Sequence, residues 1–252
     1  MDLILQEFLE NPVGKGSSII PNKNLIIEDL QRRYEKLLEK GFSKPEVYKI
    51  KNTFYFLFTI PSESERNNTY DVMIEFSDPD NKYNSDIVIK RYKMRFFSNC
   101  PSFTFTYAYV FNDNDSMVKF LRNKYEGIVL SDAPSMRNPQ GVISFEKSTY
   151  FASLFLKEHS HYLNKVFLNQ IALNSNATSL VSKVRKTNQI MKEIQSEKNR
   201  IKEENAKKRE GKTSTRSILA PVKKTVTSRS PKTNKLSPKK KITGKNPKRK
   251  LH

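Results

Sequence analysis

The last 42 residues of the chain contain fourteen Lys or Arg and no Asp or Glu. They also contain four prolines, many Ser and Thr, and few large apolar side chains. A segment of this composition cannot bury enough apolar surface to offset the conformational entropy that folding removes. Residues 211–252 are therefore predicted to form a disordered basic tail, and any fold must come from the residues before them.

The rest of the chain is close to electrically neutral. The whole protein has 46 Lys or Arg against 26 Asp or Glu, a net charge of +20. Residues 180–210 contribute ten basic and five acidic side chains, which leaves 22 basic against 21 acidic for residues 1–179. This distribution predicts a neutral globular body over 1–179, an extended charged helix over 180–210, and the basic tail.

Hydrophobic periodicity predicts that the body is an α+β domain, an antiparallel sheet packed with helices. Between residues 47 and 111, runs rich in β-branched and aromatic residues alternate with polar turns, which is typical of four or five antiparallel strands. The second predicted helix has the clearest signals, because Asn24 can cap its start and Gly41 can end it. Helices are predicted over 3–9, 24–41, 118–127, 149–158 and 162–173.

The stretch "SFTFTYAYVF", residues 102–111, has an aromatic ring at every second position. In a strand, all five rings would point to one side of the sheet. Such a row is either a platform on which nucleic-acid bases stack or one face of the hydrophobic core. Stacking platforms normally include Lys or Arg, and residues 99–118 contain neither. We therefore interpret this stretch as a core strand. Its rings are Phe103, Phe105, Tyr107, Tyr109 and Phe111.

The segment 180–210 contains no glycine or proline, and its apolar residues are sparse. Their spacings of four, seven, three and seven fit a weak heptad seam, interrupted by Thr187 and Lys198. We predict a long, mostly exposed helix that needs a partner. The alternative is a solvated helix that frays into the basic tail. The seam consists of Leu180, Val184, Met191, Ile194 and Ile201.

Cofactor, disulfide and membrane signals do not appear in the sequence. Cys100 is the only cysteine, so neither an internal disulfide nor a four-cysteine zinc site can form, and a reducing compartment is expected. The stretch "VGKGSS" lacks the first glycine and the glycine-lysine order of a phosphate-binding loop. No leader peptide and no apolar run of membrane-spanning length is found, which predicts no membrane association. No cofactor is predicted.

One pattern suggests an enzyme. Asp71, Glu75, Asp86 and Lys90 fall on neighbouring predicted strands, as the metal-binding acids of a nuclease would. The close acidic-x-Lys element of such sites is missing, and ordinary surface acids explain the residues equally well. We predict that the protein is not an enzyme, with a metal-dependent nuclease as an alternative.

The basic tail is the predicted contact surface. Its two Ser-Pro-Lys triplets, at 230–232 and 237–239, resemble the repeats of linker-histone tails. Lysines that neutralise phosphates release counterions, which gives strong, salt-sensitive binding without base recognition. The alternatives are an acidic protein surface as the partner, or a nonspecific nucleic-acid-binding protein whose body takes part. The predicted contact residues are Lys223, Lys224, Arg229, Lys232, Lys235, Lys239, Lys240, Lys241, Lys245, Lys248, Arg249 and Lys250.

Four stretches carry a family resemblance that extends from the N-terminus to about residue 200. They are "NPVGKGS", "IPSESERNNTYDV", "FSNCPSFTFTYAYVFN" and the "RNP" at 137–139. Together they resemble a group of virion structural proteins of tailed bacteriophages. The resemblance implies a head, neck or tail component without an active site. It also implies assembly in many copies with other virion proteins, and location in the virion, or in the host cytoplasm during assembly.

Overall fold

The computed structural model describes residues 3–10, 23–65, 68–77, 92–125, 138, 141, 143 and 146–214, with side chains up to 208. The chain divides into two units, Met1–Glu204 and Asn205–His252. Everything described below belongs to the first unit, apart from the last ten residues of the C-terminal helix. Among the described helices, none is both long enough and apolar enough to cross a membrane.

The body contains a four-stranded antiparallel sheet, which confirms the predicted α+β class. The strands lie side by side in the order in which they occur in the chain, and each is antiparallel to its neighbour. The strands are β1 (Glu46–Ile50), β2 (Thr53–Pro61), β3 (Thr69–Ser77) and β4 (Met94–Ser98). Five consecutive residues of β2, 54–58, are buried, which means that elements cover both faces of the sheet.

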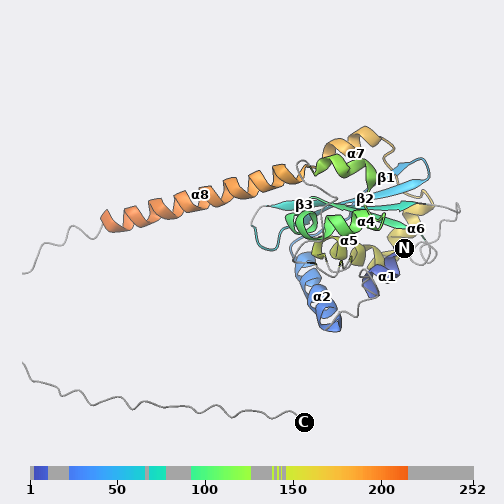
Figure 1. Ribbon diagram of the computed structural model, residues 1–252, viewed down its shortest axis with the longest axis horizontal. Coiled ribbons are helices and arrows are strands. Elements are labelled where there is room, and N and C mark those ends of the chain that lie inside the picture. The colour runs from blue at the N-terminus through green and yellow to red at the C-terminus, as the bar shows by residue number, and fades with distance from the viewer. Residues whose placement is uncertain are drawn as a thin grey trace, which may run out of the picture. The chain divides into compact units, whose positions relative to one another are not determined.

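One face of the sheet is packed with phenylalanine rings. Phe167 of α6 (Ser160–Phe167) makes edge contacts with Phe54, Phe56 and Phe76, at ring distances of 4.8 to 6.1 Å. Helix α5 (Lys147–Glu158) lies beside it, and nine of its twelve residues are buried. Helices α1 (Leu5–Glu10) and α2 (Lys23–Glu39) pack on α5 on the same side of the sheet (Figure 1). This side forms the main core.

The opposite face is covered by shorter elements. Phe120 of the 3-10 helix η2 (Lys119–Lys124) meets Tyr55 of β2, with ring centroids 5.3 Å apart. Tyr125 packs against Phe97 of β4 at 5.0 Å. Helix α7 (Ala177–Lys183) contacts β1 and lies on the far side of the sheet from α5 (Figure 1). Asp71 and Glu75 of β3 point to this second face, where each forms an ion pair with an arginine.

Both edges of the sheet are paired with irregular chain. At β1, the Lys49 N–H donates to the Asn174 carbonyl (2.8 Å), and the Asn174 N–H donates to the Val47 carbonyl (3.2 Å). At β4, the carbonyls of Leu3 and Ser116 accept from the edge strand at 2.8 and 2.7 Å. Exposed edges invite strand pairing between molecules. At these positions the backbone groups are already paired within the chain, so they are not available to a strand of another molecule.

The predicted core strand over 102–111 is wrong, because this stretch is helical. A π-helix, η1 (Phe103–Tyr107), runs into α4 (Ala108–Asp113). Phe103 and Phe111 are buried as expected, whereas Phe105 is 48% exposed. The side chains that alternate with the rings are Thr, Ala and Val, so no polar face existed to reveal the helical period. Pro101 suits the start of this helical stretch, where its missing N–H costs nothing.

The long, mostly exposed C-terminal helix is confirmed, with one break near its start. Helix α7 ends at Lys183, and α8 (Thr187–Ser214) begins after Val184, whose backbone is extended. Leu180 and Val184 are fully buried, so the first residues of the predicted seam belong to the core of the body. Thr187 is buried too, and its hydroxyl lies 3.2 Å from that of Thr104. The basic tail beyond Ser214 lies outside the described residues.

The remaining predicted helices agree in position and differ in length. Gly41 follows α2 with a φ of +87°, the left-handed conformation that a glycine adopts at a helix end. The helix predicted over 118–127 is the short 3-10 helix η2, and Gly127 lies outside the described residues. The helix predicted over 162–173 starts earlier and ends at Phe167.

Candidate functional site

None of the twelve basic residues predicted to contact a partner can be placed, because all lie beyond the described residues. In the described part of the body, several charged side chains form ion pairs with one another. Arg95 of β4 donates to Glu75 of β3 at 2.7 Å and to Asp115 at 3.2 Å. Lys119, Arg95 and Lys93 hold the pKa of Asp115 well below its usual range. The body therefore neutralises many of its cations internally.

Two residues of the nuclease hypothesis lie in the described part of the chain, and each is paired with an arginine. Asp71 and Glu75 are on the same face of β3, where Arg185 and Arg95 respectively bind them. Asp86 and Lys90 lie outside the described residues. Within the ranges that the structure describes, no three His, Cys, Asp or Glu side chains form a group that could hold a metal ion.

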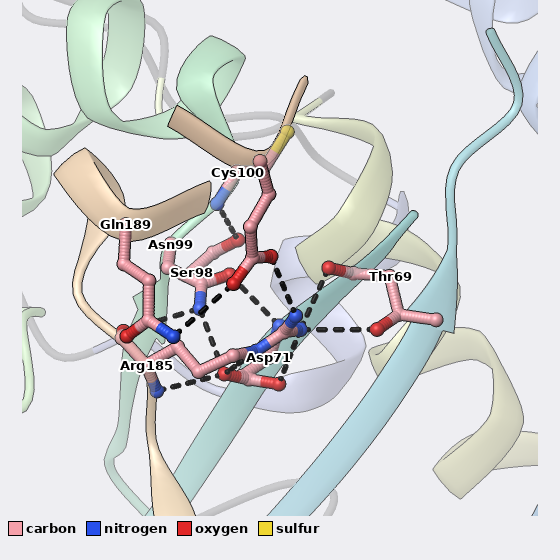
Figure 2. A network of polar contacts seen from close by, with 8 residues as sticks. Thr69, Asp71, Ser98, Asn99, Cys100, Arg185 and Gln189 are labelled. Carbon is pink, nitrogen blue, oxygen red and sulfur yellow. Dashed lines mark hydrogen bonds and ion pairs between the residues drawn. The ribbon is translucent and has the colours of Figure 1, made fainter. Parts of the chain in front are cut away.

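A polar cluster joins the link between α7 and α8 to the sheet (Figure 2). We call it the Asp71 network, and it consists of Thr69, Asp71, Asn99 and Arg185. The guanidinium of Arg185 donates to both carboxylate oxygens of Asp71, at 3.0 and 3.2 Å. It also donates to the Thr69 carbonyl at 2.7 Å and to the Thr69 hydroxyl at 3.0 Å. A planar, forked donor of this kind suits a carboxylate and a carbonyl at once.

The Asp71 network also explains the break between α7 and α8. The backbone N–H of Arg185 donates to Asp71 at 2.9 Å, and the Asn99 amide donates to the Arg185 carbonyl at 3.2 Å. Side chains of the sheet thus satisfy the two backbone groups of Arg185. Asn99 is itself held, because its amide donates to the Asp71 carboxylate at 2.8 Å. The network fixes Arg185, in the short link between α7 and α8, to the body.

Replacing Arg185 with Ala should lower the free energy of unfolding by roughly 2–3 kcal/mol, because the Asp71 carboxylate keeps its burial and loses its charged partner. Asp71 is only 6% exposed. Urea denaturation followed by circular dichroism measures the change. The matched control is Arg200→Ala, which removes an exposed pair with Glu197 on the same helix. We expect no measurable change for the control, and equal losses in the two variants would contradict a structural role for the network.

A second feature of the body is a pocket of about 430 Å³, which we call the Glu146 pocket. Its walls come from the end of β2 and the loop after it, the start of α5, and the first turns of α8. Most of the wall is apolar, with Ile60, Pro61, Phe151, Met191 and Ile194 among its residues. Pockets of this size and character commonly bind small ligands or a few side chains of a partner.

Glu146 gives this pocket its distinctive chemistry. The residue is 1% exposed and caps α5, where its Oε2 accepts from the Thr149 N–H at 2.8 Å and from the Ser148 hydroxyl at 2.6 Å. The Oε1 atom is buried and has no hydrogen-bond partner among the described residues. Burial raises the pKa of Glu146, and the two hydrogen bonds offset this only in part. A buried carboxyl oxygen without a hydrogen-bond partner is costly, and buried acids with a raised pKa are candidates for functional residues.

Cys100 also lines the Glu146 pocket, and its environment makes it unreactive. The side chain is unpaired with any other cysteine and is buried. Burial raises its pKa to about 12, so the protonated thiol predominates at neutral pH. A thiol in this state is a poor nucleophile. Cys100 therefore contributes to the pocket as a small, weakly polar wall residue.

No pattern in the sequence marks Arg185 or Glu146 as notable. Asp71 is noticed there only as a possible metal ligand, although an acid within the apolar run "YDVMIEF" often has a buried partner. That partner is 114 residues away, and a single sequence gives no signal at this distance. Glu146 looks like an ordinary helix-start acid, since Glu is favourable near a helix N-terminus. Searches of protein-family models, curated proteins and solved structures found no match to this chain.

Proposed function

We propose that this chain is a non-enzymatic structural component of a tailed-bacteriophage particle, in the head, neck or tail. In this proposal several copies assemble through their bodies, and the basic tail of each copy contacts DNA. The resemblance of four stretches to virion structural proteins of tailed bacteriophages supports the proposed role in the particle. The protein would then act in the virion, and in the host cytoplasm during assembly, together with other virion proteins.

The observation that carries the DNA contact is the separation of charge along the chain. Residues 1–179 are nearly neutral, and the described body pairs several of its cations with its own acids. The basic tail, in contrast, has fourteen positive charges and no acid with which to pair them. Free positive charge is what attracts a polyphosphate, and it is concentrated in one segment of the chain.

The attachment of α8 supports a tethering role. The Asp71 network fixes Arg185, just before this helix, to the sheet, and Leu180, Val184 and Ile190 are buried in the body. The basic tail is therefore joined to the body through a helix whose first turn is held by side-chain contacts. A structural protein that binds nucleic acid without reading its sequence needs only such an anchor and a cationic segment.

The mass of the purified full-length chain in solution, alone and with a short DNA duplex, tests this proposal. Light scattering should give a multiple of the 29.4 kDa chain mass, and the duplex should join the complex. A monomer under both conditions, together with absence from purified particles, would contradict the proposal. Polyglutamate in place of DNA tests the acidic-surface alternative. A complex with polyglutamate and none with DNA would favour a protein partner for the basic tail.

A further inference from the structure

Helix α8 carries a stripe of exposed polar side chains. We call it the Lys192 stripe, and its members are Lys192, Gln195, Asn199 and Lys202, all of them exposed. Their spacings of three, four and three residues place them along one side of the helix. The Gln195 amide donates to the side-chain oxygen of Asn199 at 3.0 Å, as neighbours on one side can. Ile190, which is buried in the body, lies on the opposite side of the helix.

The two lysines of the stripe are not neutralised within the described part of the protein. Neither has an ion-pair partner among the described residues. Glu197 and Glu204 of the same helix both pair with Arg200. Glu193 pairs with the arginine of the Asp71 network, and Glu203 lies beside the C-terminal end of the stripe. The stripe therefore presents two free positive charges and two amides to solvent.

Free positive charge beside amide donors fits a row of phosphates. In protein–DNA complexes, phosphate oxygens accept hydrogen bonds from Lys and from Asn or Gln side chains. The two lysines are ten residues apart, which corresponds to about 15 Å along a helix. A DNA duplex carries one phosphate per about 1.7 Å of its axis, so each lysine can contact a separate phosphate. We propose that the Lys192 stripe is a second DNA-binding surface, which contacts phosphates without reading the bases.

This inference rests on the proposed function, because the basic tail has to bring the DNA to the helix. The basic tail begins within the last turn of α8, which ends at Ser214. A duplex that is bound by the tail is therefore at a high effective concentration for the helix. The stripe and the tail then bind one partner, which favours DNA over a separate acidic protein as the occupant of the stripe.

The salt dependence of DNA affinity in two variants of the full-length chain tests the inference. Fluorescence anisotropy of a labelled duplex measures the affinity. One variant replaces Lys192 and Lys202 with Gln, which removes two charges and keeps a good helix former at both positions. The matched control replaces Lys207 and Lys208 with Gln. These two lysines are exposed on the same helix, lie off the stripe, and are closer to the basic tail.

The stripe variant should lose about 1.8 units of slope in the plot of log affinity against log salt concentration, at about 0.9 for each phosphate contact. The control should keep the slope of the unmodified protein. No loss in the stripe variant, or an equal or larger loss in the control, would overturn the inference. Weaker binding of the stripe variant to polyglutamate, with DNA binding unchanged, would overturn it in favour of an acidic protein.

The same measurements separate this inference from the proposed function. If the unmodified protein binds the duplex and both variants keep its slope, the inference fails and DNA binding by the basic tail stands. If the unmodified protein does not bind the duplex, the proposed DNA contact fails as well.

Discussion

Replacing Phe103 with Ala should lower the free energy of unfolding by about 3–5 kcal/mol, whereas replacing Phe105 with Ala should lower it by about 1 kcal/mol or less. Phe103 is fully buried and packs on Phe111 and Tyr125, at ring distances of 5.0 and 6.3 Å. Its removal leaves a cavity that the surrounding rings fill only in part. Phe105 is 48% exposed, so water can fill the space that it vacates.

The two variants separate the observed helix from the strand that the alternating pattern predicted. In a strand, residues 103 and 105 point the same way and would lose similar amounts of stability. In the helical stretch, they point to different sides. Urea denaturation followed by circular dichroism measures both changes, and Phe111→Ala is a second buried control. Similar losses for Phe103→Ala and Phe105→Ala would show that the segment is extended.

The sheet and the main helices could be predicted because their residue patterns are unambiguous. Strands β2 and β3 consist of long runs of β-branched and aromatic residues, which few helices contain. Helix α2 has an apolar stripe with buried Leu30 and Tyr34, and a glycine at its end. Residues 102–111 carry the same kind of β-branched and aromatic run and are helical, so such a run does not by itself distinguish a strand from a helix, and the prediction failed there.

The contacts that shape the candidate sites depend on residues that are far apart in the chain. The break before α8 follows from the bonds that Asp71 and Asn99 make to the backbone of Arg185. Local propensity favours one continuous helix there, since 180–210 contains no glycine or proline. The Glu146 pocket likewise combines residues from five separate stretches of the chain. Tertiary contacts override local preference at both places, and a single sequence does not show them.

The central claim, that the basic tail and not the body binds DNA, is tested most directly by the salt dependence of DNA affinity in two charge-matched variants of the full-length chain. One replaces Lys239, Lys240 and Lys241 with Gln, and the other replaces the exposed body residues Lys36, Lys40 and Lys165 with Gln. Both lose three positive charges, so any difference reflects position and not net charge.

Each phosphate contact contributes a slope of about −0.9 to the plot of log affinity against log salt concentration. The account predicts that the tail variant loses about 2–3 units of slope and, near 0.1 M salt, on the order of 100-fold in affinity. It predicts that the body variant keeps the slope of the unmodified protein. A loss of slope in the body variant, with none in the tail variant, would show that the body binds the DNA and would contradict the account.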